Sequence, residues 1–122
     1  MPIIDVQFVL PKSESLPEGL AQTLVDRLGH VLAVKPGSLW LRLQVLPASQ
    51  YAENESSTPG PDLPVFVTVM HAKSPTGKAL ESEAIAVAQV VAEAVAKRRT
   101  QVHVEYAPSG AGRIAFGGNL VQ

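Results

Sequence analysis

The sequence contains no cysteine, and only 5% of its residues are aromatic. The absence of cysteine excludes disulfide bonds, thiolate metal sites and a cysteine nucleophile, and it is compatible with a reducing cytoplasm. The net charge of -1 comes without a long basic run, which argues against a nucleic-acid-binding protein. No apolar run approaches membrane-spanning length, and the amino terminus lacks a signal-peptide pattern. We therefore expect a cytoplasmic protein with neither nucleic-acid nor membrane partners.

Two common ligand-binding patterns are also missing. The three histidines, His30, His71 and His103, are scattered without the spacing of a metal site. The stretch SPTGKAL contains a Gly-Lys pair but lacks the upstream glycines of a phosphate-binding loop. The sequence therefore indicates no metal site and no nucleotide-binding loop.

The composition is that of a globular protein, because 46% of its 122 residues are apolar and 17% are charged. This length predicts one domain with a modest core. Runs rich in β-branched and aromatic residues predict four strands. They lie at residues 3–10, 39–46, 64–72 and 102–108.

Two further stretches predict helices. In the first, Ser15 and Glu18 have capping-box spacing, and apolar residues then recur at helical intervals until Lys35. The second follows Ser74 and ends near the basic residues at 97–99, where cations complement the helix dipole. Its expected apolar face consists of Ile85, Ala88, Val91, Ala92 and Val95.

The order strand, helix, strand occurs twice. Pro2 and Pro64 each precede a strand, and LRLQVLP near residue 41 matches VHVEYAP near residue 102 in its pattern of apolar and polar residues. We expect a single domain over residues 1–122. It divides into a pseudo-repeat at 2–47 and 64–108, a connector at 48–63 and a C-terminal hairpin at 109–122.

The repeat predicts an α/β (α+β) fold of two tandem β-α-β units, each with parallel strands joined by a right-handed crossover. Together the units form a four-stranded mixed sheet with two helices on one face. The other face is also expected to carry apolar residues, so it needs a second cover, which we expect to be another subunit. The residues assigned to this second face are Ile3, Val9, Val65, Val67 and Val69.

Several short stretches carry a resemblance to a known family. They are a strand-opening proline after Met1, LPEGL (16–20), AVKPGSL (33–39), LRLQV (41–45), VLP (45–47), GKALES (77–82) and GRIAFGGNL (112–120). With the doubled β-α-β unit and the chain length, they make the sequence similar to the double-length branch of the tautomerase superfamily. The resemblance implies a homotrimer of barrel-like symmetry, an N-terminal proline that shuttles a proton between an enol and the adjacent carbon, and no metal or organic cofactor. It also implies a place in aromatic compound catabolism.

Pro2 is the catalytic candidate. Removal of Met1 would leave a free secondary amine, and initiator methionines that precede proline are usually removed. An α-amine titrates near ~8 and proline's amine higher, so a base at neutral pH needs its pKa lowered by an apolar pocket or nearby cations. Proline at the start of a strand is also a common structural feature, and Pro64 at the same repeat position has no free amine.

Cationic and polar residues are the substrate-binding candidates. Arg42 and Lys35 are candidates for holding a substrate carboxylate, with Arg113 as a weaker second arginine. The resemblance places His103 at a position that reaches a neighbouring subunit's pocket. Glu105 could orient it or activate water, and Phe116 could wall an apolar pocket. Each also has a structural interpretation: a solvated strand face, a helix-end cation, a half-exposed histidine, a surface carboxylate or a core contact.

We expect a cofactor-independent tautomerase or isomerase that acts on a small unsaturated 2-keto or 2-hydroxy acid, with Pro2 as the base. One alternative is a hydratase or dehalogenase on the same scaffold, with Pro2 protonated and Glu105 activating water. Another is a non-catalytic ferredoxin-like binding or assembly module, in which Met1 stays and Pro2 is inert.

Overall fold

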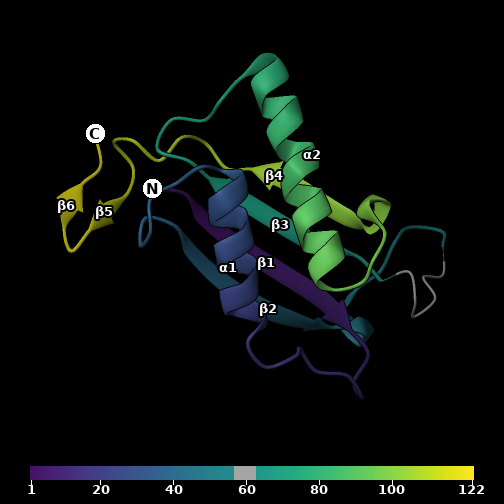
Figure 1. Cartoon of the computed structure of the whole chain (residues 1–122). Helices are drawn as coiled ribbons and strands as arrows, with labels where there is room; N and C mark the ends of the chain where they lie inside the picture. The colour runs from purple at the N-terminus through teal and green to yellow at the C-terminus, as the bar shows by residue number, and fades with distance from the viewer. Residues whose placement is uncertain (57–62) are drawn as a thin grey trace.

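The computed structural model describes residues 1–56 and 63–122, so part of the expected connector at 48–63 lies outside the described residues. Within these described residues, two α-helices and six strands follow one another (Figure 1). The first half holds β1 (Ile3–Leu10), α1 (Leu20–Val31) and β2 (Trp40–Pro47). The second half holds β3 (Val65–Met70), α2 (Gly77–Ala94), β4 (Val102–Tyr106), β5 (Ala115–Phe116) and β6 (Asn119–Leu120). Short 3-10 helices at Ala48–Gln50 and Arg99–Gln101 follow β2 and precede β4.

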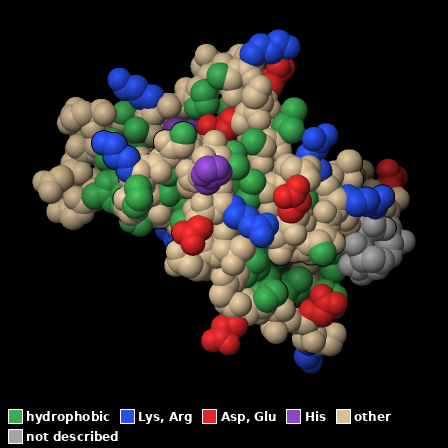
Figure 2. All heavy atoms as spheres, in the orientation of Figure 1, with side chains coloured by type: hydrophobic (Ala, Val, Ile, Leu, Met, Phe, Trp, Pro, Cys, Tyr) green, Lys and Arg blue, Asp and Glu red, His purple; other side chains and the backbone are tan. Residues whose placement is uncertain are grey.

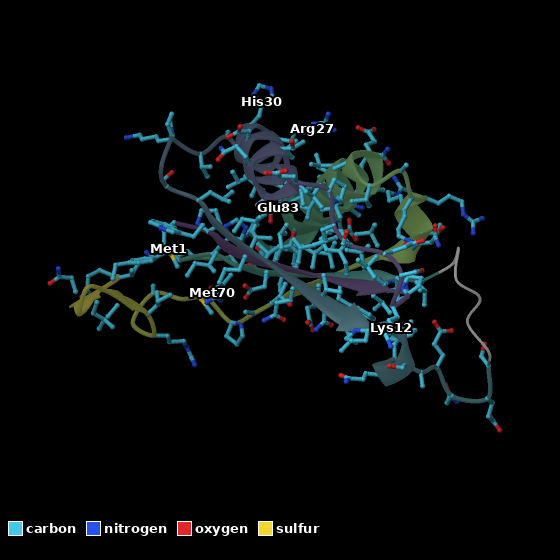
Figure 3. All side chains as sticks on the ribbon, turned by 90° about the horizontal axis from the view of Figure 1, so that it is seen from below. Met1, Lys12, Arg27, His30, Met70 and Glu83 are labelled. Carbon is cyan, nitrogen blue, oxygen red and sulfur yellow. The ribbon has the colours of Figure 1, made fainter. Side chains whose placement is uncertain are left out.

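The main sheet has the strand order β2-β1-β3-β4. β1 pairs with β2 and β3 pairs with β4 in parallel, whereas the two central strands β1 and β3 pair antiparallel. Both helices lie on one face of this sheet (Figures 1 and 3). The expected pair of β-α-β units in a four-stranded mixed sheet is therefore confirmed.

The core lies between the sheet and the two helices. From β1 it receives Ile4, Val6 and Phe8, which are at most 1% exposed, and from the helices it receives fully buried residues such as Leu24 and Val91. The buried part of the core is entirely apolar, since no polar or charged residue is buried among those described.

The expectation of a second apolar face is wrong for the valines of β3. Val65, Val67 and Val69 are fully buried in the core with the residues of β1. The antiparallel register sets Val6 opposite Val67, so these valines share the face that the helices cover. The open face of the sheet carries a group of polar side chains around a hollow. Its polar side chains include Asp5, Gln7, Arg42, Gln44, Thr68 and Glu105.

The helix ends also differ from the sequence-based expectation. α1 starts at Leu20 after Gly19, whose φ of 82° is a left-handed conformation that suits glycine, and no side chain caps it. The prediction that Ser15 and Glu18 form a capping box is therefore wrong. α2 ends at Ala94, so the basic residues at 97–99 lie beyond the helix instead of in its last turn. Ile85, which was expected on the apolar face of this helix, is 52% exposed, whereas Val87 is fully buried. The helical face of the molecule carries positive and negative side chains intermixed (Figure 2).

After β4 the chain continues in the same direction, alongside the end of β3 and the segment that follows it. The amide of Ala107 donates to the carbonyl of Val69 at 2.9 Å, and the amide of Gly110 donates to the carbonyl of His71 at 2.7 Å. A small hairpin of β5 and β6 follows, and it lies beside the amino terminus (Figure 1). Its turn uses Gly117 and Gly118, both with positive φ as a type I′ turn requires.

No helix in the described ranges 1–56 and 63–122 is long and apolar enough to cross a membrane.

Candidate functional site

Pro2 is buried at the start of β1, one of the two central strands of the sheet. Its carbonyl accepts a hydrogen bond from the amide of Trp40 at 3.1 Å, which ties it to β2. On the other side Ile3 pairs with Met70, so the next position along each strand sets Pro2 against His71. While Met1 is attached, the nitrogen of Pro2 is a tertiary amide, which carries no proton and has no basic lone pair.

Apolar groups also gather near this end of β1. A Cβ atom added to Gly110 would lie 3.1 Å from Cε of Met1, 3.2 Å from Sδ of Met70 and 3.3 Å from Cγ2 of Ile114. These four residues, Met1, Met70, Gly110 and Ile114, form what we call the apolar end. Figure 3 shows Met1 and Met70 toward the end of the sheet from which the C-terminal segment extends. The contacts are so close that glycine is the residue that fits position 110 without displacement.

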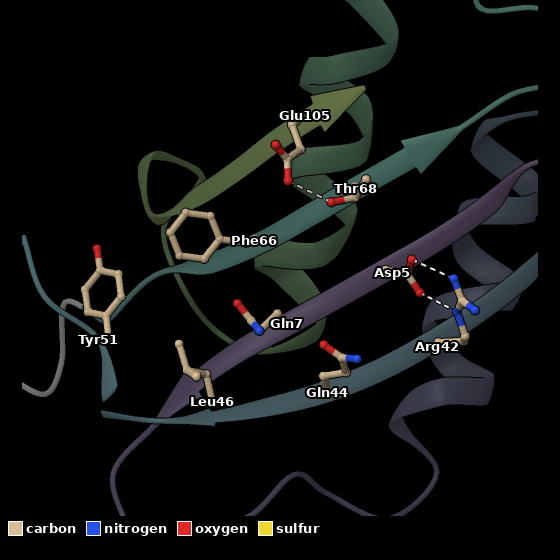
Figure 4. Close-up of a pocket in the computed structure, with 9 residues that line it drawn as sticks. All are labelled: Asp5, Gln7, Arg42, Gln44, Leu46, Tyr51, Phe66, Thr68 and Glu105. Carbon is tan, nitrogen blue, oxygen red and sulfur yellow. Dashed lines mark hydrogen bonds and ion pairs between the residues drawn. The ribbon is translucent and has the colours of Figure 1, made fainter. Parts of the chain in front are cut away.

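A second feature, the polar hollow, occupies the open face of the sheet and has a volume of about 640 Å³. Its lining comes from all four strands and from Tyr51 (Figure 4). Arg42 donates two hydrogen bonds to Asp5, from Nε at 2.6 Å and from Nη2 at 2.9 Å. This side-chain hydrogen bond, with the charge of Asp5, raises the pKa of Arg42, so the guanidinium stays ionised. Across the hollow, the hydroxyl of Thr68 donates to Glu105 at 2.9 Å.

The structure divides the residues expected at the site between these two features. Arg113 and Phe116 belong to the C-terminal segment beside the apolar end, where Arg113 donates its amide to Gly110 at 2.8 Å and Phe116 stacks on Trp40 at 4.6 Å. Arg42 and Glu105 line the polar hollow instead. Arg42 pairs with Asp5, three residues beyond Pro2, which is roughly 10 Å along the strand.

Two other candidates line neither of these two features. His103 pairs with Phe66, which in turn pairs with Gln7, five residues and roughly 16 Å along β1 from Pro2. Its ring lies 5.4 Å from that of Phe66. Lys35 lines a separate hollow against α1, on the helical side of the molecule. Within one chain, therefore, the strand register places His103 well away from Pro2.

Sequence reasoning missed a network of three side chains that we call the carboxylate network: His71, Glu83 and Tyr106. Oε2 of Glu83, on α2, is 2.8 Å from Nε2 of His71 and accepts a hydrogen bond from the hydroxyl of Tyr106 at 2.8 Å. The rings of His71 and Tyr106 are nearly parallel, at 12° and 6.3 Å. Burial, and then the hydrogen bond to Glu83, raises the pKa of Tyr106, so this phenol remains a donor at neutral pH.

The described residues contain no group of histidine and carboxylate side chains arranged to hold a metal ion. The carboxylate network contains a single histidine and a single carboxylate, so its chemistry is that of proton sharing and hydrogen bonding. Its two hydrogen-bonded pairs are 12 and 23 positions apart in the chain, so no local sequence motif indicates the network.

Several solved structures share this fold. No protein-family model matches the sequence, and no curated protein matches it by sequence. Among solved structures, the macrophage migration inhibitory factor from Oncomelania hupensis is 19% identical, with a TM-score of 0.73 over 99% of this chain and 82% of that chain. A structure described as fused 4-OT wild type symmetric trimer is 15% identical, with a TM-score of 0.76 over 98% and 94%.

A third structure, the macrophage migration inhibitory factor homologue from Prochlorococcus marinus, is 13% identical, with a TM-score of 0.73 over 98% of this chain and 99% of that chain. These neighbours are tautomerase superfamily members, so the likeness expected from the sequence is confirmed at the level of the fold. The near-complete coverage shows that the whole chain, not one half of it, shares this fold.

Proposed function

We propose that this chain is a tautomerase or isomerase that moves a proton between the enol oxygen and a carbon of a small unsaturated 2-keto or 2-hydroxy acid. The observation that carries the proposal is the position of Pro2. It is buried at the start of a central strand, and Met1 next to it fills the apolar end. Removal of Met1 then does two things at once, because it frees the secondary amine and vacates the space beside it.

The apolar end supplies the environment that a neutral amine needs. Burial disfavours the charged form of an amine and lowers its pKa, and a cation nearby acts in the same direction. Met70 and Ile114 provide apolar walls, and Arg113 sits one residue before Ile114. Phe116, stacked on Trp40, extends the apolar surface. We expect these groups to keep the amine of Pro2 neutral near pH 7.

The reaction needs one base that also returns the proton. The neutral nitrogen of Pro2 takes the proton from the enol hydroxyl or from an activated carbon, which leaves an enolate and a protonated amine. The amine then gives the same proton to the other end of the conjugated system. Proline suits this role because its ring fixes φ and with it the direction of the nitrogen lone pair.

The substrate carboxylate requires a cation close to Pro2, and Arg113 is our first candidate. Arg42 already binds Asp5 through two of its N–H groups and lies farther along the strand, so it is a secondary one. His103 would reach the pocket only from another subunit. Lys35 lies on the segment that leads into Trp40, whose amide donates to the carbonyl of Pro2, so it stays a further cation candidate. Glu105 accepts from Thr68 in the polar hollow, and we assign it no step in this reaction.

The structural neighbours support an assembled form of the enzyme. Two of them are described as symmetric or asymmetric trimers of fused 4-OT. Within the described chain, β2 and β4 form the two edges of the main sheet. We propose a homotrimer in which these edges meet and His103 of a neighbouring subunit approaches the Pro2 pocket. Another neighbour, Pt0534, is described as inactivated by 2-oxo-3-pentynoate, an unsaturated 2-oxo acid of the substrate class proposed here.

One alternative function has an observation of its own. The side chain of Met1 fits the apolar end closely, as it would in a non-catalytic binding module that retains its methionine. The hydratase or dehalogenase alternative has less support, because Glu105 faces the polar hollow and is engaged by Thr68.

The same purified protein can serve as test and control. It is assayed for tautomerisation of phenylpyruvate and of hydroxymuconate before and after treatment with methionine aminopeptidase, and intact mass reports the loss of Met1. We expect activity, and alkylation of Pro2 by a halopyruvate, in the processed form alone. A fully processed protein whose Pro2 resists the halopyruvate and which turns over neither compound would overturn the proposal.

A further inference from the structure

The carboxylate network connects α2 to the ends of β3 and β4 that stand beside Pro2. Glu83 lies on α2, His71 directly follows β3, and Tyr106 is the last residue of β4. The side chains of His71 and Glu83 are only 16% and 17% exposed. A carboxylate this far from solvent is costly unless donors satisfy it, and here two donor groups converge on a single oxygen.

The network extends to the apolar end through the backbone. The carbonyl of His71 accepts the amide of Gly110, and the carbonyl of Ala72 accepts the amide of Ala111 at 3.0 Å. The hydroxyl of Ser109 accepts the amide of Ser74 at 3.0 Å. These bonds fix the segment after β4 against the segment after β3. Gly110 is at the centre of that contact, and a Cβ atom added to it would lie 3.1 to 3.3 Å from Met1, Met70 and Ile114.

The register brings the same network to Pro2 from the other side. Since Ile3 pairs with Met70, His71 occupies the position that faces Pro2 on the neighbouring strand. Any shift of His71 therefore moves both the strand beside Pro2 and the backbone that holds Gly110. A displacement of about 1 Å near reacting groups can change a rate roughly 100-fold.

We propose that the carboxylate network is a positioning device for the Pro2 site, in which Glu83 holds His71 and Tyr106 and thereby sets the shape of the apolar end. The inference rests on the proposed function for its catalytic consequence. His71, Glu83 and Tyr106 are positioning residues that act through the backbone around Gly110, and Pro2 alone exchanges the proton with the substrate.

The chain offers a matched pair of substitutions on one helix. Glu83→Gln removes the charge that both donors share but keeps the size of the side chain. Glu81→Gln makes the same change two residues earlier, at an exposed position whose ion-pair partner is Lys78 at 3.3 Å. Tyr106→Phe removes one donor and keeps the ring, so it serves as a milder variant should Glu83→Gln fail to fold by circular dichroism.

Two measurements on the processed protein test the inference. Hydrogen exchange of the Gly110 amide reports the backbone contact without any reference to catalysis. We expect it to accelerate roughly tenfold in Glu83→Gln and to change less than about twofold in Glu81→Gln. Steady-state kinetics should show kcat lowered roughly 10- to 100-fold in Glu83→Gln with a smaller change in KM, and Tyr106→Phe should fall between this variant and the parent.

The outcomes separate this inference from the proposed function. If the parent protein has no activity but Glu83→Gln accelerates exchange at Gly110, the network holds the apolar end and the proposed reaction fails. If exchange at Gly110 is the same in Glu83→Gln and Glu81→Gln, the positioning device is overturned, whatever the activity. A kcat that is unaltered in Glu83→Gln in an active parent overturns it too.

Discussion

Arg42 and Asp5 form a two-point ion pair across the parallel strands β1 and β2, with N–O distances of 2.6 and 2.9 Å. The pair sits on the open face of the sheet, three residues beyond Pro2. Arg42, the first candidate from the sequence for binding a substrate carboxylate, is thus already engaged by Asp5. Arg113, next to the apolar end, has no side-chain partner among those described and takes that role in our proposal.

The two arginines should therefore differ in kinetic effect. We expect Arg113→Met to lower kcat/KM at least about tenfold, mainly by raising KM, because a charge-assisted hydrogen bond to the substrate is lost. Arg42→Met should lower it less than about threefold. Steady-state kinetics on the processed protein measure both effects. An inverted order would return the carboxylate site to Arg42.

Gly110→Ala should respond to the state of the amino terminus. Its new Cβ would meet Met1, Met70 and Ile114 at 3.1 to 3.3 Å, so we expect a cost of about 1–2 kcal/mol while Met1 is present. Loss of Met1 removes one of these three neighbours, and the cost should then decrease. Chemical denaturation of the two forms, each compared with its own parent, measures the change. An equal cost in both forms would mean that Met1 does not fill the space beside Gly110.

Tyr106 makes stability depend on alkaline pH. Its pKa is raised, chiefly by burial and then by its hydrogen bond to Glu83. A tyrosine in the unfolded chain ionises near ~10, so the stabilisation is fully present below about pH 10 and is lost as the pH rises from there toward the folded pKa. The parent should lose thermal stability over this range more steeply than Tyr106→Phe does.

Tyr51 is the control for that experiment. Its pKa is also raised, by a hydrogen bond to Glu53 at 2.6 Å, but both groups are on the surface. Tyr51→Phe should leave the alkaline loss of stability nearly unchanged. If Tyr51→Phe and Tyr106→Phe flatten the pH dependence equally, the network does not protect Tyr106.

The orientation of β3 predicts a large cost for one valine substitution and a small cost for another. Val67 is fully buried beneath the helices, so Val67→Ala should destabilise the fold by roughly 2 kcal/mol. Val45 on the edge strand β2 is 48% exposed, and Val45→Ala should cost less than about 0.5 kcal/mol. Urea unfolding distinguishes the two, and a Val67→Ala cost as small as that of Val45→Ala would contradict the packing.

Local patterns were enough to predict the order of elements and the doubled unit. The repeat of strand, helix and strand depends on the periodicity of apolar residues within about ten positions, which a single sequence displays. The valines of β3 were assigned to the wrong face of the sheet. Their face depends on which residue of β1 lies opposite Val67, and that pairing joins positions 61 apart (67 − 6). A period-2 pattern has two faces and does not say which one the helices cover.

The site divides in the same way. Pro2 could be proposed as the base because it directly follows Met1 and precedes a predicted strand. The carboxylate network could not be predicted, since His71 follows β3, Glu83 lies on α2 and Tyr106 ends β4, and the three meet only once the second β-α-β crossover has formed. The ion pair of Arg42 was likewise invisible, because Asp5 and Arg42 are 37 positions apart and become neighbours through the parallel register of β1 and β2.

The two halves of the repeat begin with prolines that are chemically unequal. Pro64 stands just before β3 as Pro2 stands just before β1, yet Pro64 lies within the chain and its nitrogen is always acylated. In our proposal each polypeptide therefore has one reactive secondary amine, that of Pro2, and a trimer has three. Titration with a halopyruvate should saturate at a stoichiometry of one label per polypeptide. Because Pro64 has no free amine, the second half of the chain does not need to keep its leading proline accessible to a substrate.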